Sequence, residues 1–223
     1  MIWKLTEEKD WTSLEQQFQW IRDMKGTPQH RLHHGEGDVA AHTRMVLEAL
    51  QQQPAYQNLP QQEQEILWAA ALLHDVEKRS TSVDEGEGRI TSKGHAKRGE
   101  YTVRTLLFKD IPTPFSIRET ITSLVRYHGL PIWFMEREEP MKKVCEASFR
   151  VDNRLLKILT TADIQGRICE DKAVLMESVE WFEMFCREHD CWGKARTFST
   201  DEARFHYFHT ENSYVDYVPF EQF

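Results

Sequence analysis

Six residues dominate the chemistry that this 223-residue sequence could perform. His74 and Asp75 stand side by side at the end of an apolar run. Isolated histidines and acids flank them on both sides: His42, His95, His128 and Asp163. Imidazole nitrogens and carboxylate oxygens are the ligands that borderline and hard divalent ions take in proteins. The set therefore predicts a site for one divalent ion, and it holds enough donors for two.

Metal-assisted hydrolysis is the chemistry that this donor set favours. A divalent ion lowers the pKa of coordinated water toward neutrality, and two ions a few ångströms apart can clamp the oxygens of a phosphate ester. Adjacent residues on a helix diverge by about 100°. His74 and Asp75 can therefore serve one centre only at a helix end, or if Asp75 bridges two ions with its two oxygens. We expect the helix to end just after Asp75.

Cations that could hold a phosphate group follow the His-Asp pair. We expect four residues to contact the substrate: His34, Lys78, Arg79 and Lys97. Asp75 and Lys78 are expected to take part in catalysis. His33 and His34 are otherwise interpreted as exposed loop residues that could line the site. Gly94, just before His95, is expected to allow close approach of the backbone.

Nearly every segment has the three- and four-residue apolar spacing of an amphipathic helix. The expected helices cover about 11–24, 39–52, 60–74, 94–108, 116–128, 155–169 and 172–189, with one more short helix after a loop at 131–140. Asp38 is expected to cap the second helix, and Ser116 with Glu119 reads as a capping box. The apolar density of 60–74 predicts a central, buried helix. Residues 78–92 are expected to be a polar loop with a short extended piece at 89–91.

The charge balance limits the partners. The formal net charge is −8, with 28 Lys and Arg against 36 Asp and Glu. A protein that wraps long nucleic acid non-specifically shows a basic face, so we expect a small phosphorylated substrate or a single strand end. No apolar run approaches the roughly 20 residues that span a bilayer, and the N-terminus lacks the pattern of a secretory signal. We therefore expect a cytoplasmic location and no membrane partner.

The cysteine spacing and the predicted domain organisation are those of an ordinary globular protein without a disulfide framework. Cys145, Cys169, Cys186 and Cys191 form no Cys-x-x-Cys pair, so we expect reduced thiols, with a Cys186–Cys191 disulfide as the alternative. We interpret residues 1–190 as one all-α domain with a core at about 30–170. Residues 191–223 are interpreted as an aromatic-rich C-terminal extension, a candidate link to a further module in a longer polypeptide.

Five blocks of the sequence, in order, resemble the HD family of metal-dependent phosphohydrolases. The blocks are His34–Thr43, Ala71–Lys78, Gly94–Gly99, Leu124–Gly129 and Ala162–Asp163. They are similar to the HD modules attached to bacterial tRNA nucleotidyltransferases, and to the HD phosphoesterase joined to a polynucleotide kinase in bacterial RNA end-healing enzymes. The likeness covers roughly residues 30–170. Glu77 stands where those modules often have Gly, so the turn after Asp75 is expected to differ.

The resemblance implies an all-α HD-domain helical bundle and a set of roles. It implies four primary ligands for one or two divalent ions, with Mn²⁺, Ni²⁺, Co²⁺ or Mg²⁺ as candidates: His42, His74, Asp75 and Asp163. It makes His95 and His128 ligands of a second ion or phosphate contacts, and Lys78 a phosphate contact. The implied partners are a phosphorylated nucleotide or nucleic-acid 3′ end and a fused polynucleotide kinase module.

The reaction implied by the resemblance is phosphoester hydrolysis. The enzyme would remove a 3′-phosphate or open a 2′,3′-cyclic phosphate at an RNA or DNA end. Two alternatives stay open. One is a small-molecule nucleotidase or cyclic-nucleotide phosphodiesterase, which the acidic net charge slightly favours. The other is a catalytically idle HD scaffold, against which the complete donor set argues.

Overall fold

The apolar run before His74 forms the central helix of the molecule. In the computed structural model, which describes residues 1–193 and 200, α5 (Gln61–Leu73) is buried from Glu65 to its last residue. A helix that is apolar all round must be covered on every side. Three helices pack against it: α3 (Val39–Gln52), α8 (Phe115–Tyr127) and α11 (Asn153–Gln165). The prediction of a buried central helix is confirmed.

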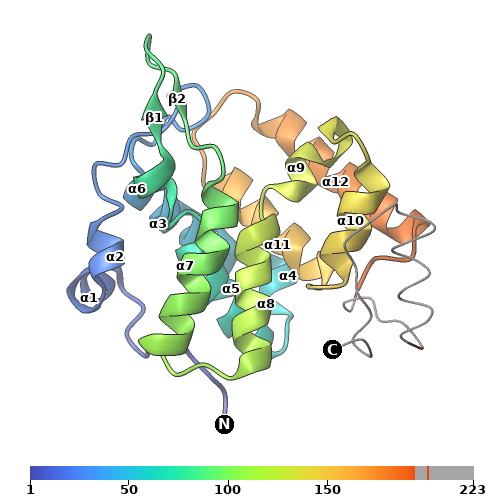
Figure 1. Ribbon diagram of the computed structural model, residues 1–223, viewed down its shortest axis with the longest axis horizontal. Coiled ribbons are helices and arrows are strands. Elements are labelled where there is room, and N and C mark those ends of the chain that lie inside the picture. The colour runs from blue at the N-terminus through green and yellow to red at the C-terminus, as the bar shows by residue number, and fades with distance from the viewer. Residues whose placement is uncertain (194–199, 201–223) are drawn as a thin grey trace, which may run out of the picture.

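The other helices form the outer parts of the bundle (Figure 1). α7 (His95–Lys109) runs beside α8, and α12 (Lys172–Glu188) packs on α11 and α9. The remaining elements are α1 (Trp11–Gln17), α2 (Gln19–Arg22), α4 (Pro54–Gln57), α6 (Lys78–Thr81), α9 (Leu130–Trp133), the 3₁₀ helix η1 (Phe134–Glu136) and α10 (Pro140–Ser148). One antiparallel pair, β1 (Val83–Asp84) with β2 (Ile90–Thr91), projects from the bundle. The all-α fold is confirmed, as is the short extended piece in the 78–92 loop.

The prediction of one continuous helix over about 11–24 is wrong, because the structure divides this segment into two helices. Phe18 is extended (φ −120°, ψ 118°), so it ends α1 and begins α2. Its ring stacks on Trp20 with the two ring centroids 4.9 Å apart. The break changes the direction of the second helical turn, and Trp20 and Ile21 are both buried there. Tertiary packing therefore overrides the local helical spacing.

The predicted capping box at the start of α8 is also wrong. α8 begins at Phe115, directly after Pro114, so Ser116 already lies within the first turn and caps nothing. The Glu119 carboxylate instead accepts hydrogen bonds from Arg104 of α7, at 3.0–3.2 Å. Glu119 therefore forms an ion pair between neighbouring helices instead of the hydrogen bond within α8 that a capping box requires.

Other boundaries differ by a few residues. Lys78 to Thr81 form a helical turn where a loop was expected, and the expected loop at 131–140 contains α9 and η1. α11 ends at Gln165 rather than near Cys169, and Gly166 follows it. A Cβ on Gly166 would lie 2.7 Å from the backbone nitrogen of Val46. Only glycine permits this close approach, which brings the end of α11 against α3.

Most of the C-terminal extension predicted at 191–223, namely positions 194–199 and 201–223, lies outside the described residues. Within the described part, no helix is both long and apolar enough to cross a bilayer. Cys145, Cys186 and Cys191 are buried, and the Cys186–Cys191 disulfide considered from the sequence is not formed. The Sγ atoms of Cys145 and Cys191 lie 3.8 Å apart.

Asp38 caps α3, as predicted, and holds the preceding loop as well. Its Oδ1 accepts a hydrogen bond from the Ala41 N–H at 2.8 Å, and its Oδ2 accepts one from the Gly26 N–H at 2.8 Å. We expect Asp38→Ala to lower the free energy of unfolding by about 1–2 kcal/mol, the usual cost of losing an N-cap. Urea denaturation measures this. Asp38→Asn keeps the cap and should give an intermediate value; an Ala variant as stable as the wild type would contradict the role.

Candidate metal centre

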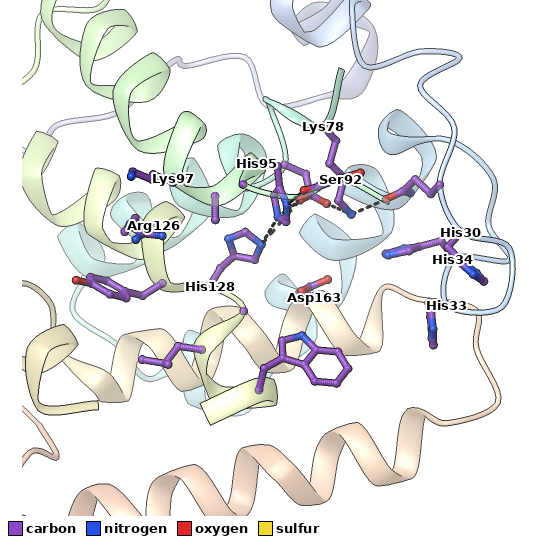
Figure 2. A pocket seen from close by; sticks show the side chains of 18 of the residues that line it. His30, His33, His34, Lys78, Ser92, His95, Lys97, Arg126, His128 and Asp163 are labelled. Atoms are coloured by element: carbon purple, nitrogen blue, oxygen red, sulfur yellow. Dashed lines mark hydrogen bonds and ion pairs between the residues drawn. The ribbon is translucent and has the colours of Figure 1, made fainter. Parts of the chain in front are cut away.

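The six predicted donors come from five separate helices and meet at one place. His42 lies on α3, His74 and Asp75 follow the last residue of α5, His95 opens α7, His128 follows α8, and Asp163 lies on α11. All are buried except His95, whose side chain is 24% exposed. Figure 2 shows His95, His128 and Asp163 lining one cavity. The volume of this cavity is about 560 Å³. The order of the motifs along the chain thus becomes a cluster in space.

The His-Asp pair is placed by the end of α5. His74 adopts helical angles as the C-cap, and a tight turn follows in which the Lys78 N–H donates to the Asp75 carbonyl oxygen at 2.9 Å. The helix end predicted at this pair is confirmed. Because the chain turns here, the two adjacent side chains can face the same centre, which mid-helix geometry would prevent.

Each of the four histidines has its Nδ1 turned toward a hydrogen-bond acceptor at 2.7–2.8 Å. The acceptors are the carbonyl oxygens of Ala71, Ser92 and Val125 for His74, His95 and His128, and Oε1 of Glu36 for His42. A proton on Nδ1 faces the acceptor in each case and leaves the lone pair on Nε2. All four Nε2 atoms therefore present a ligand lone pair to the same centre.

One group of donors surrounds Oδ2 of Asp75. The Nε2 of His74 lies 3.1 Å from this oxygen, and the Nε2 of His42 lies 3.7 Å from it. The Nε2 of His42 also lies 3.1 Å from Oδ1 of Asp163. His42, His74 and Asp163 form a compact set of one ligand atom each, suited to one ion.

A second group surrounds Oδ1 of the same aspartate. The Nε2 atoms of His95 and His128 lie 3.3 and 3.8 Å from it. These two nitrogens are only 3.2 Å apart. With both lone pairs pointing inward they repel each other unless a cation or a proton lies between them. The separation suits two nitrogens that bind one ion at about 2.0–2.1 Å. Asp75 thus stands between the two groups, one oxygen toward each.

Unsatisfied polar atoms support the fit to a divalent ion. The Nε2 of His42, the Nε2 of His74 and the Oδ1 of Asp75 are buried without a hydrogen-bond partner, although they converge. Leaving such groups unpaired in a protein interior costs roughly 1–3 kcal/mol each. A cation at the centre would satisfy all three at once, so the residues present fit one or two divalent ions.

The buried carboxylates keep their negative charge. Burial would raise the pKa of Asp75, but the neighbouring His74 and Lys78 outweigh it and hold that pKa well below its usual range. Burial would likewise raise the pKa of Asp163, but Arg167 and His42 lower it well below normal. Both side chains are therefore anionic at neutral pH, as ligands of a divalent ion must be.

The histidines divide into two kinds. Burial, with His74 and His95 nearby, lowers the pKa of His128 to about 3. Burial also lowers the pKa of His95. In contrast, burial of His74 is outweighed by Asp75 and Asp163, which raise its pKa. Without a cation at the centre, His74 is the ring that takes up a proton first.

The raised pKa of His74 gives a pH prediction for metal binding. A protonated imidazole cannot bind a metal, so binding must release this proton. The affinity for Mn²⁺ should be fully developed above the raised pKa of His74 and should fall as the pH drops through it. His128, with a pKa of about 3, stays neutral during this change. Calorimetry in buffers of different ionisation enthalpy counts the released protons; an affinity independent of pH would contradict the assignment.

Two residues of the site were not singled out from the sequence. Glu36 is almost fully enclosed: its Oε1 accepts from the Nδ1 of His34 and lies 2.8 Å from the Nδ1 of His42, and its Oε2 accepts from the Ile168 N–H at 2.8 Å. Burial would raise its pKa, but the hydrogen bonds from His34 and His42 lower it. Arg167 grips both oxygens of Asp163 with two hydrogen bonds, at 3.1 and 2.6 Å.

A sequence signal existed for only one of these two residues. Arg167 lies four residues after Asp163, the spacing at which helical side chains meet. Glu36 lies in a Gly-Glu-Gly loop with no periodicity, and nothing local marks it as the partner of His42. Only the resemblance of the block His34–Thr43 to the HD family points to this loop.

The expected substrate contacts fall into two classes. Lys78, Lys97 and His34 line the cavity (Figure 2). The Nζ of Lys78 lies 2.8 Å from Oδ2 of Asp75 and 2.7 Å from Oε1 of Gln29. Arg79 does not line the cavity, because its guanidinium group pairs with Asp23.

The expectation that His34 is an exposed loop residue is wrong. It is buried, and its Nδ1 donates to Glu36 at 2.8 Å. Burial and the nearby Lys78 lower the pKa of His34 to about 3. Its ring is therefore neutral. His33 is half exposed, as expected, with its Nδ1 3.4 Å from Asp171.

The backbone conformations of Glu77 and Gly94 show where a glycine is needed near the metal centre and where it is not. Glu77 adopts φ −95°, ψ 3°, which any residue can take, so the turn needs no glycine. Its buried carboxylate accepts from Thr102 at 2.8 Å and joins the turn to α7. Gly94 is the residue just before α7 and has φ 81°. Nothing lies within 4 Å of the position that a Cβ on Gly94 would take. Its value here is the left-handed conformation rather than close approach.

Glu36 offers a test of how the ligands are held. The Glu36→Gln variant keeps the size of the side chain but weakens the acceptor that faces the Nδ1 atoms of His34 and His42. We expect a 10- to 100-fold loss of affinity for Mn²⁺, the usual effect of removing such a partner, with the helical circular dichroism unchanged. Glu48→Gln, on the exposed face of α3, is the matched control. Equal affinities in the two variants would contradict the role of Glu36.

A comparison with protein families places the chain. Residues 38–155, just over half of its length, match the HD domain. The chain therefore belongs to the HD family of metal-dependent phosphohydrolases, and the HD-domain helical bundle expected from the sequence is confirmed. The matched segment contains His42, His74, Asp75, His95 and His128, while Asp163 follows it. No protein with curated information matches the chain.

Proposed function

We propose that this protein hydrolyses phosphate esters at the 3′ ends of nucleic-acid strands, removing a 3′-phosphate or opening a 2′,3′-cyclic phosphate. The observation that carries the hydrolytic part is the convergence of unpaired donor atoms on the two oxygens of Asp75. The choice of ester is supported by the five sequence blocks that resemble the HD modules of RNA end-healing enzymes. A cavity of about 560 Å³ beside the donors leaves room for a terminal nucleotide.

The roles of the side chains follow from their contacts. His42, His74 and Asp163 would hold one ion, His95 and His128 a second, with Asp75 shared between them. When bound, such ions supply Lewis acidity toward the phosphate and an activated water. Arg167 fixes the orientation of the Asp163 carboxylate through its two hydrogen bonds.

Two further side chains would handle the substrate itself. Lys78 keeps an ammonium group beside Asp75, where the oxygens of an incoming phosphate can accept its hydrogen bonds. The neutral ring of His34 donates a hydrogen bond from its Nδ1–H to Oε1 of Glu36. The Nε2 of His34 is then left as an acceptor for a substrate hydroxyl or a water.

The proposal is tested by one panel of substrates. Purified protein is given Mn²⁺, Ni²⁺, Co²⁺ or Mg²⁺ together with an oligonucleotide 3′-phosphate, a 2′,3′-cyclic oligonucleotide end, 2′,3′-cyclic mononucleotides or an aryl phosphate. We expect turnover of both oligonucleotide ends. Turnover of mononucleotides alone would contradict end healing and favour the small-molecule nucleotidase. Inactivity with every metal would favour a scaffold without catalysis.

A further inference from the structure

The cavity beside the metal centre is larger than a phosphate group needs. Its volume of about 560 Å³ lies in the range of pockets that enclose whole small-molecule ligands. It is lined from α7, α8, α9 and the loop that carries His30, His33 and His34. Much of the substrate beyond the scissile phosphate must therefore contact this surface.

The charge of the lining is opposite to that of the whole chain. Six lysines and arginines line the cavity, against three acids: Lys78, Lys97, Arg126, Arg137, Lys143 and Arg167, with Asp75, Glu146 and Asp163. The chain as a whole has a net charge of −8. Asp75 and Asp163 belong to the metal centre and would be neutralised there. The cavity is therefore built for an anion with more than one charge.

The cations divide into an inner and an outer set. Lys78 and Arg167 bind the carboxylates of the metal centre, and Lys143 pairs with Glu146. The outer set consists of Lys97, Arg126 and Arg137. Within the described residues, Lys97 and Arg137 form no ion pair.

Two of the outer cations, Lys97 and Arg126, are neighbours in sequence of the second ligand group, and Arg137 lines the same cavity. Lys97 lies two residues after His95, and Arg126 lies two residues before His128. In the view of Figure 2, Lys97 and Arg126 lie to one side of His128, and His30, His33 and His34 lie to the other side. The Nε of Arg126 lies 3.5 Å from Oε2 of Glu100.

An aromatic surface adjoins the same centre. Trp133 lines the cavity and is 39% exposed. Its Cδ1 would lie 3.8 Å from a Cβ on Gly129, the residue after His128, so the indole packs beside the metal centre. Exposed indole faces bind nucleobases by stacking without regard to sequence. The surface therefore combines a face for a base with cations for a phosphate.

We propose that Lys97, Arg126 and Arg137 form a binding site for a second phosphate of the substrate, on the 5′ side of the terminal nucleotide whose 3′-phosphate enters the metal centre. This inference rests on the proposed function. The second phosphate is either a 5′-phosphomonoester of a single nucleotide or the phosphodiester that joins the last nucleotide to a strand. Recognition of this group selects nucleic-acid ends over nucleosides that carry one phosphate only.

The test compares three substrates: a nucleoside 3′-monophosphate, a nucleoside 3′,5′-bisphosphate and a dinucleotide with a 3′-phosphate. In the wild type we expect kcat/KM for at least one of the last two to exceed that of the first by roughly 100-fold, about fivefold for each of the three cations that bind the second phosphate. If both the bisphosphate and the dinucleotide are preferred, the second phosphate that the site binds is the phosphodiester of a strand. If the bisphosphate alone is preferred, the site binds a 5′-phosphomonoester. Equal kcat/KM for all three would overturn the proposal.

The variants separate the phosphate site from general effects. Lys97→Ala/Arg137→Ala should lower the preference ratio about tenfold or more, and helical circular dichroism checks its fold, since both side chains are exposed. Lys93→Ala, an exposed cation before α7 that does not line the cavity, should keep the wild-type ratio. A double variant that lowers kcat/KM for all three substrates equally would contradict the site.

Binding distinguishes this inference from the proposed function. In Asp75→Asn protein, which should not hydrolyse the substrates, calorimetry should show the 3′,5′-bisphosphate binding at least tenfold tighter than the 3′-monophosphate. Adding Lys97→Ala/Arg137→Ala should remove the difference. If no substrate is hydrolysed but this difference is present, the proposed reaction fails and the phosphate site stands. If hydrolysis proceeds without any difference in binding or rate, the phosphate site fails alone.

Discussion

Replacing Asp75 with Asn should lower the rate of phosphoester hydrolysis by roughly 10³-fold or more, the scale seen when one essential group of a catalytic set is removed. One carboxylate oxygen faces His42 and His74, and the other faces His95 and His128. Asn has the same shape but offers an NH₂ group, which cannot bind a cation, in place of one oxygen. Both groups of ligands would lose their shared member.

The fold should survive this change. The substitution creates no cavity, and an uncharged amide is easier to bury than a carboxylate. Circular dichroism and urea denaturation should therefore show a folded helical protein. Asp110→Asn, at the exposed end of α7, is the matched control and should keep full activity. Undiminished turnover in Asp75→Asn, or in the harsher Asp75→Ala, would refute the assignment.

Removal of metal should abolish activity and lower the melting temperature together. Without a cation, the facing nitrogens of His95 and His128, 3.2 Å apart, and the unpaired Nε2 atoms of His42 and His74 are left uncompensated. A ligand present at 100 times its Kd stabilises the folded state by about 2.7 kcal/mol. For a domain of this size, each kcal/mol shifts Tm by roughly 2–4 °C. Restoring metal should thus raise Tm by roughly 5–10 °C.

The measurement is thermal unfolding of chelator-treated protein, before and after addition of Mn²⁺, Ni²⁺, Co²⁺ or Mg²⁺. Activity should return with the metal that gives the largest shift. Protein with His74→Ala and His128→Ala is the control, since it lacks one donor from each group and should show little or no shift. A chelator-treated wild type that keeps its activity, or whose Tm no metal changes, would contradict a metal centre.

The sequence was most informative where the chemistry is carried by rare residue types in a fixed order. Histidines and acids at His42, His74, Asp75, His95, His128 and Asp163 were expected together, and the fold brings them within a few ångströms. The apolar density of 60–74 likewise predicted the buried α5, because a helix without a polar face has only one place in a bundle. Composition and order were sufficient for both results.

The errors arise where a tertiary contact decides the outcome. Glu119 fits a capping box locally, but Arg104 on a neighbouring helix binds it instead. Arg79 follows the His-Asp pair, but the helical turn α6 directs it to Asp23. Glu36 lies in the loop just before α3, and the fold places its Oε1 2.8 Å from the Nδ1 of His42. No local periodicity encodes such partners, so they become visible only in the folded molecule.

Anomalous diffraction from crystals grown with Mn²⁺ is the most direct measurement of the central claim, that these six residues form a divalent-metal centre around Asp75. We expect a strong peak among His42, His74, Asp75 and Asp163, with a second peak among Asp75, His95 and His128 when two ions bind. Asp75→Asn crystals grown in the same way should lose or weaken these peaks. Wild-type crystals without any peak in the cavity, at Mn²⁺ concentrations that support activity, would contradict the account.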